Sequence, residues 1–241
     1  MSPLVFVHGF LGGSEQWGPQ EPLGRDREVI CVDLPGFGKN AHLPPINTIR
    51  GFAEWVFADL TQRGVLSFDL LGHSMGGMIV QEMIHLAPAR VNRLILYGTG
   101  PTGALPGRFE PIEVSMQRAR KDGPKATARR IASKWFHEGQ SSAAYDDCAQ
   151  IAEASTLPAI LAGLEAMQGW SGEKNLQSIE AKTVVIWGDK DRSYPWSQVE
   201  ALWQPIKNSN LAVVPNAGHA THLEKPEIFN ARISDFLKLD E

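Results

Sequence analysis

The chain is poor in cysteine, in long apolar runs and in net positive charge, and each shortage excludes a class of protein. Its two cysteines, Cys31 and Cys148, stand far apart among 241 residues, so the sequence offers no disulfide framework and no zinc-type spacing. No run of about 18 apolar residues occurs, so we expect no membrane-spanning helix. The formal net charge of −4 provides no basic surface for nucleic acid. Without a secretory signal pattern, we expect a cytoplasmic protein.

What is present is an ordinary globular composition, with 43% hydrophobic and 21% charged residues. Short apolar runs alternate with amphipathic helical patterns. Alternating strands and helices favour right-handed crossovers, so we expect an α/β fold with a mostly parallel, doubly wound sheet. The expected strands cover residues 3–7, 29–33, 68–71, 93–97, 183–187 and 211–214.

This alternation stops between residues 101 and 178, where only helical patterns occur. We therefore predict a core made of residues 1–100 and 179–241, with residues 101–178 inserted between the fourth and fifth strands. Such an insertion would lie above the carboxyl edge of the sheet, where ligands bind in this class of fold. The helices expected within it cover residues 111–121, 125–136, 142–153 and 157–168.

The most informative stretch is Gly72-His73-Ser74-Met75-Gly76, between an expected strand and an expected helix over residues 75–86. A serine on such a tight strand-to-helix turn exposes its hydroxyl. The glycines allow a close approach of backbones or a positive φ. The turn also leaves the Met75 amide free at a helix N-terminus, where negative charge is favoured. We predict that Ser74 is a nucleophile; the alternative is a solvated serine in a glycine-rich turn.

A serine nucleophile needs a base, and the base needs an acid that orients it. Asp191 follows the expected strand that ends at Trp187, and His219 follows the one that ends at Val214. The order Ser74, Asp191, His219 is that of α/β-hydrolase triads. Because all three follow the carboxyl ends of strands, we expect them to converge at one edge of the sheet.

The acid and the base each have a competitor nearby. Asp189 competes with Asp191 as the acid, and the spacing from Gly188 favours Asp191. His222 competes with His219 as the base, and His219 is favoured because it follows a turn-forming Ala-Gly. The two histidines could also form a metal pair, but no third ligand stands near them, so we expect neither metal nor cofactor. His8 and His73 are expected to be structural or pocket-wall residues.

The motifs together resemble those of the α/β-hydrolase fold superfamily over nearly the whole chain. Members usually begin with an antiparallel hairpin before the first motif, whereas this strand starts at residue 3, so we expect a shorter sheet of about six strands. The matching motifs are His8-Gly9-Phe10, Asp33-Leu34-Pro35-Gly36-Phe37-Gly38, Gly72-His73-Ser74-Met75-Gly76-Gly77, Gly188-Asp189-Lys190-Asp191 and Gly218-His219.

The resemblance implies that the amides of Phe10 and Met75 form the oxyanion hole and that residues 101–178 form a helical cap (lid) over an acyl pocket. Within the superfamily the chain looks most similar to small lidded esterases, enol-lactonases and carbon–carbon bond hydrolases. Apolar residues at helical spacing mostly pack against the sheet, and some should line the pocket. As lining residues we select Trp135, Phe136, Met167 and Trp170.

The leading hypothesis is a serine hydrolase that cleaves small-molecule carboxylic esters or lactones of small to medium acyl groups, as a monomer or homodimer. A second is a carbon–carbon bond hydrolase, or a lyase similar to the cyclohexadiene-carboxylate synthase of menaquinone biosynthesis. Such a lyase usually carries several pocket arginines. A third is a non-catalytic or slow ligand receptor of the same fold. The candidate arginines are Arg108, Arg118, Arg120, Arg129 and Arg130.

Overall fold

The computed structural model describes residues 1–104 and 110–238, and its centre is a parallel β-sheet. Within that described part the sheet has six strands in the order β2-β1-β3-β4-β5-β6, and every neighbouring pair is parallel. The prediction of a short, doubly wound parallel sheet is confirmed. The strands are β1 (Leu4–Val7), β2 (Val29–Val32), β3 (Phe68–His73), β4 (Val91–Tyr97), β5 (Lys182–Gly188) and β6 (Ser209–Val214).

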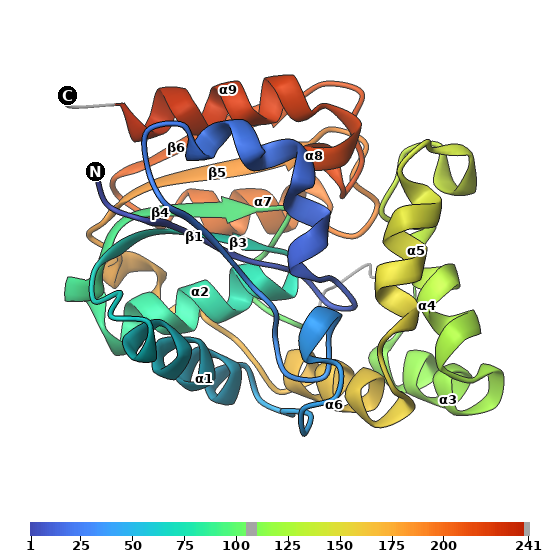
Figure 1. Cartoon of the computed structure of the whole chain (residues 1–241). Helices are drawn as coiled ribbons and strands as arrows, with labels where there is room; N and C mark the ends of the chain where they lie inside the picture. Colours follow the sequence, from blue (N-terminus) through green and yellow to red (C-terminus); the bar gives the residue numbers. More distant parts are fainter. Residues whose placement is uncertain (105–109, 239–241) are drawn as a thin grey trace.

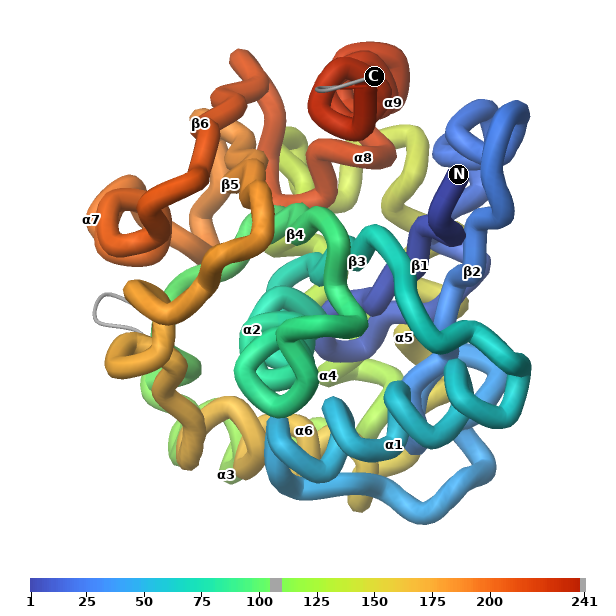
Figure 2. Tube along the Cα trace, turned by 90° about the vertical axis from the view of Figure 1, so that its left-hand side faces the viewer, coloured from blue at the N-terminus to red at the C-terminus, as the bar shows by residue number. Residues whose placement is uncertain are grey.

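Alternate side chains of the strands fill two separate cores, one on each face of the sheet. On one face, Val5, Leu70 and Val185 pack with helices α1 (Ile49–Gln62), α2 (Met75–Leu86) and α7 (Trp196–Trp203). On the other face, Phe6 and Ile186 pack with α9 (Pro226–Leu237) and the 3₁₀ segment η1 (Ser14–Gly24). Figure 2 shows α9 on the opposite side of the sheet from α1 and α2. Burial on both faces explains why the strands are almost continuously apolar.

The helices between β4 and β5 gather on the side toward which the strands point (Figure 1). They are α3 (Ile112–Asp122), α4 (Pro124–Ala132), α5 (Tyr145–Glu153) and α6 (Leu157–Gln168). No helix in the described ranges is long and apolar enough to cross a membrane. The remaining short helices are η2 (Gly38–Asn40), η3 (Pro88–Arg90), η4 (Gly139–Ser141), η5 (Glu173–Ser178) and α8 (Thr221–Glu224).

The helix expected over residues 125–136 ends earlier, at Ala132. This early end allows a contact with the loop that carries His219. Tight i to i−3 hydrogen bonds replace the helix there, including one from the Trp135 amide to the Ala132 carbonyl oxygen at 3.1 Å. The Trp135 carbonyl oxygen is thereby free to accept from the Ala220 amide at 2.8 Å. That bond joins the segment after α4 to the residue next to His219.

Candidate active site

Ser74 lies between the end of β3 and the start of α2 with φ 57° and ψ −120°. A positive φ is strained for a residue with a Cβ and persists only where neighbours hold it. Here the Ser74 amide donates to the Tyr97 carbonyl oxygen at 2.9 Å, and its carbonyl oxygen accepts from Thr99 Oγ1 at 2.8 Å. Strand β4 and the loop after it therefore hold the turn that presents the Ser74 hydroxyl.

The glycines on either side of Ser74 permit close packing rather than an unusual φ. Neither Gly72 nor Gly76 is among the described glycines with positive φ. A Cβ on Gly72 would overlap the Gly76 carbonyl oxygen, and a Cβ on Gly76 would overlap the Val7 carbonyl oxygen. Of the two reasons for glycine given above, close approach applies to both positions, and the positive φ belongs to Ser74 itself.

Asp191 and His219 meet at the carboxyl edge of the sheet, where β5 and β6 end. Nδ1 of His219 lies 2.9 Å from Oδ2 of Asp191, and both side chains are buried. The second carboxylate oxygen of Asp191 accepts from the amides of Ser193 at 2.7 Å and Tyr194 at 3.1 Å. Asp191 is thus positioned to orient the His219 imidazole and to stabilise its charged form.

The competing acid, Asp189, has different partners. Its carboxylate accepts from the Asn216 amide at 2.6 Å and lies 3.3 Å from Nζ of Lys190. Among the described residues no hydrogen bond joins Asp189 to His219. The geometry therefore favours Asp191, because the acid of a triad must contact Nδ1 of the base.

Two aromatic rings pack against the His219 imidazole. The His73 ring centroid lies 4.5 Å from that of His219, and the Tyr194 ring stacks on it at 5.5 Å and 19°. His73 also donates from Nε2 to the His219 carbonyl oxygen at 3.1 Å. Burial, with smaller contributions from His219 and His222, lowers the pKa of His73 well below its ordinary value. His73 is therefore a neutral support for the loop that carries His219.

The competing base, His222, contacts no carboxylate among the described residues. Its Nδ1 lies 3.1 Å from the Tyr97 hydroxyl. Burial and the neighbouring His219 lower the pKa of His222 to about 3. A general base works best with a pKa near the operating pH, so His222 is poorly suited to that role.

The two amides expected to form the oxyanion hole come from the turn after β1 and from the start of α2. Met75 is the first residue of α2, and Phe10 lies in a turn closed by the Gly12 amide and the Gly9 carbonyl oxygen at 3.0 Å. Within the described ranges, neither amide donates to another group of the chain. Free amides at a helix N-terminus and in a tight turn are suited to binding negative charge.

His8 holds the turn that carries Phe10. The Leu34 amide donates to Nε2 of His8 at 3.0 Å, so Nδ1 carries the proton and donates to the Gly9 carbonyl oxygen at 2.8 Å. Burial lowers the pKa of His8, which keeps the imidazole neutral. The loops after β1 and β2 are therefore joined beside the candidate oxyanion hole.

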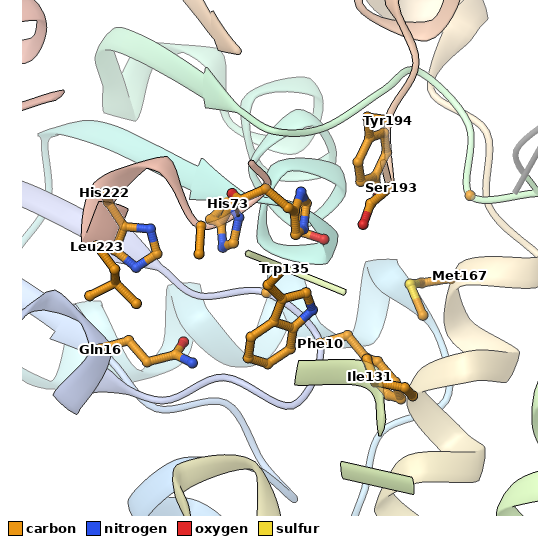
Figure 3. Close-up of a pocket in the computed structure, with 15 residues that line it drawn as sticks. Phe10, Gln16, His73, Ile131, Trp135, Met167, Ser193, Tyr194, His222 and Leu223 are labelled. Carbon is orange, nitrogen blue, oxygen red and sulfur yellow. Dashed lines mark hydrogen bonds between the residues drawn. The ribbon is translucent and has the colours of Figure 1, made fainter. Parts of the chain in front are cut away.

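Ser74 and His219 line one pocket. The segments between β4 and β5 contribute further lining residues, which Figure 3 labels. From those segments come Ile131, Trp135 and Met167, and the pocket has a cavity volume of about 60 Å³. That volume is small beside the roughly 300–1,000 Å³ of pockets for drug-sized ligands. Further lining residues that the sequence reasoning missed are Gln16, Ser193, Tyr194, Ala220 and Leu223.

Of the four aromatic and methionine residues selected for the pocket, Trp135 and Met167 line it and the other two lie elsewhere. Phe136 is buried against Tyr145, with ring centroids 6.5 Å apart. Trp170 donates from Nε1 to Oε2 of Glu82 at 3.3 Å, beside α2. Phe136 and Trp170 are not among the described residues that line this pocket, because the turn after α4 and the end of α6 direct them into these other contacts.

Three of the five candidate arginines pair with carboxylates that are not among the described lining residues of the pocket. Arg118 and Arg130 pair with Glu110 at 3.4 and 2.8 Å, and Arg129 pairs with Glu153 at 2.7 Å. Arg120 is exposed, and Arg108 lies outside the described residues. No arginine is among the described residues that line the pocket. That part of the chain also holds no group of three or more His, Cys, Asp or Glu that could bind a metal ion.

Comparisons with known proteins agree with this architecture. The family described as alpha/beta hydrolase fold matches residues 2–226. A pimeloyl-[acyl-carrier protein] methyl ester esterase from Legionella pneumophila is 26% identical, over 98% of this chain and 95% of that protein. The structure of a thermophilic esterase from Thermogutta terrifontis has a TM-score of 0.90 at 25% identity, covering 99% of this chain and 90% of that one.

An enol-lactonase from Burkholderia xenovorans LB400 shares the fold, with a TM-score of 0.88 at 20% identity over 98% of this chain and 91% of that one. The match to the family covers most of the chain, and hydrolases and esterases recur among its relatives. The chain belongs to the alpha/beta hydrolase fold family and is a hydrolase.

Proposed function

We propose that this protein is a serine hydrolase that cleaves small carboxylic esters or lactones through a Ser74–His219–Asp191 triad. The observation that carries the proposal is a single pocket lined by both Ser74, on its strained turn, and His219, whose Nδ1 is held by Asp191. The names of the Legionella and Thermogutta relatives support ester cleavage.

The proposed mechanism has two steps. Nε2 of His219 takes the Ser74 proton as the hydroxyl attacks the substrate carbonyl, while Asp191 stabilises the imidazolium. The amides of Phe10 and Met75 bind the oxyanion that develops, and one such donor is typically worth about 3 kcal/mol. His219 then returns the proton to the leaving alcohol, and water hydrolyses the acyl-enzyme by the same relay.

The small pocket favours short acyl groups. Its cavity of about 60 Å³ is bounded by Phe10, Ile131, Trp135 and Met167, which leave little room for a long chain. The segments that carry Ile131, Trp135 and Met167 act in this proposal as a cap, as expected for residues 101–178. The lyase alternative is disfavoured because the described lining residues include no arginine to hold a dianionic substrate.

Hydrolysis of short p-nitrophenyl esters tests the proposal. Ser74→Ala should lower kcat by a factor on the order of 10⁶, as loss of a triad nucleophile does. It should also abolish labelling by a fluorophosphonate while leaving the thermal midpoint near that of the wild type. Ser141→Ala, which removes an exposed hydroxyl, is the matched control. Unchanged ester turnover in Ser74→Ala would overturn the triad, and a wild type that neither hydrolyses nor takes the label would favour the receptor alternative.

A further inference from the structure

One end of the candidate pocket carries buried polar side chains that the triad does not use. His222 and Gln16 both line the pocket, and they are 1% and 6% exposed. Figure 3 shows them with Leu223 at one end, apart from Met167 and Ser193. Buried polar groups are normally hydrogen-bonded, so spare hydrogen-bonding capacity at this position calls for a partner.

The proton positions around Tyr97 leave an acceptor on His222. The Tyr97 hydroxyl lies 2.7 Å from the His219 carbonyl oxygen, which can only accept, so Tyr97 donates there. Nδ1 of His222, 3.1 Å from the same hydroxyl, must therefore carry a proton and donate to it. Nε2 of His222 is then an unprotonated acceptor, and it is buried without a partner among the described residues.

The side-chain amide of Gln16 also has few hydrogen-bond partners. Its side-chain nitrogen has one partner in the described part of the chain, Sγ of Cys148 at 3.6 Å. A thiol sulfur is a weak acceptor, so this contact leaves most of the amide's donor capacity unused. The side-chain oxygen of Gln16 accepts no hydrogen bond from any described residue. Gln16 therefore offers both a donor and an acceptor to a bound group.

The charges around the pocket indicate that this group is neutral. No Asp, Glu, Lys or Arg is among the described residues that line it. The low pKa of His222 keeps its imidazole uncharged at ordinary pH. Desolvating a carboxylate or an ammonium group at such a place, with no counter-charge, would be costly. A hydroxyl group matches the site because it donates one hydrogen bond and accepts others.

We propose that His222 and Gln16 form a subsite for an uncharged hydroxyl group of the substrate, which donates to Nε2 of His222 and accepts from the Gln16 amide. The substrate class is then a hydroxylated ester or lactone. This inference rests on the proposed function and adds a specificity that the triad does not supply.

Pairs of esters in which a hydroxyl replaces a methyl group of similar size test the subsite. The hydroxyl lies on the alcohol side in 2-hydroxyethyl butanoate, compared with propyl butanoate. It lies on the acyl side in methyl 3-hydroxybutanoate, compared with methyl 3-methylbutanoate. We expect the wild type to prefer the hydroxylated ester of at least one pair by about fivefold or more in kcat/KM, as neutral hydrogen bonds allow.

Two variants remove the subsite. Gln16→Met keeps the length of the side chain without its amide. His222→Asn keeps a donor near the position of Nδ1 and removes Nε2. In each variant, the kcat/KM of the hydroxylated ester relative to its methyl analogue should fall close to one, for the pair in which the wild type shows a preference. The matched controls, Gln150→Met and His85→Asn, change exposed residues and should keep the wild-type ratio. A ratio within a pair is unaffected by partial loss of folded enzyme.

The outcomes separate this inference from the proposed function. If the wild type hydrolyses all four esters without preferring a hydroxylated one, or if the preference survives in either variant, the subsite is overturned and the triad is untouched. If the wild type hydrolyses none of them and p-nitrophenyl acetate is also inert, the proposed function fails first.

Discussion

The backbone of α2 at Gly76 packs directly on the carbonyl oxygen of Val7, at the end of β1. A Cβ at position 76 would also lie 2.5 Å from the His8 carbonyl oxygen. This contact places the turn that carries Ser74 against the loop that carries Phe10. Both atoms that a side chain would meet belong to the backbone, so a rotamer change cannot relieve the clash.

Gly76→Ala should therefore destabilise the protein by at least about 3 kcal/mol, the upper end of ordinary overpacking costs. Urea unfolding gives the free energy directly. Gly18→Ala is the matched control, because a Cβ there has no atom within 4 Å, and it should change stability by less than about 1 kcal/mol. Equal stabilities of the two variants would contradict the close contact.

The two aspartates after β5 should respond very differently to the same substitution. Asp191→Asn should lower kcat by about 10⁴-fold, because an amide at this position favours the wrong tautomer of His219. Asp189→Asn should leave kcat close to the wild-type value, because its partners are Asn216 and Lys190. Steady-state kinetics on a short ester decides between them, and a larger loss in Asp189→Asn would reverse the assignment.

The acyl-length limit should depend on Met167. Met167→Ala removes a side chain that lines the pocket, so the kcat/KM for hexanoate relative to acetate esters should rise. Met116→Ala removes the same side chain from α3, where it is half-buried and not among the described lining residues. We expect this control to keep the wild-type length profile. A profile unaffected by Met167→Ala would show that the acyl chain binds elsewhere.

His222 should make the protein less stable in mild acid. Its ordinary pKa is 6.5, and in the folded protein it falls to about 3. Between these values the unfolded chain binds a proton that the folded protein does not, so the free energy of unfolding falls as the pH decreases. Proton uptake by the unfolded chain at this residue lowers the free energy of unfolding by about 1.4 kcal/mol for each pH unit below 6.5. Above pH 6.5 this residue does not change the stability.

Urea unfolding at pH 7, 6 and 5 measures this dependence. His222→Asn removes the titrating group, so its stability should fall less steeply with decreasing pH than that of the wild type. His85→Asn, at an exposed histidine, should follow the wild-type slope. Parallel slopes for wild type and His222→Asn would show that His222 takes up a proton in the folded state.

The position of the candidate site was predictable because it depends on features that are local in sequence. Apolar runs mark the strands, and parallel strands bring their carboxyl ends to one edge of the sheet. Ser74, Asp191 and His219 each follow such an end, so their convergence could be expected without a structure. The tight turn at Ser74 could likewise be inferred from the glycines around it, since only a close backbone contact or a positive φ requires them.

The fine geometry was not predictable from the sequence. Trp135 and Phe136 are adjacent, and only the end of α4 at Ala132 decides which of them lines the pocket. Helical spacing cannot show this, because a helix that ends a turn early redirects every later side chain. The positive φ at Ser74 also depends on partners from β4 and the loop after it.

The sequence by itself determined the fold class, the order of the candidate triad and the edge of the sheet where it lies, because periodicity and turn residues act over short distances. Only the tertiary structure decided which aspartate contacts His219 and which side chains line the pocket. It also revealed the unused hydrogen-bonding groups of Gln16 and His222. Contacts and unpaired polar atoms depend on which distant segments pack together, so no local sequence pattern predicts them.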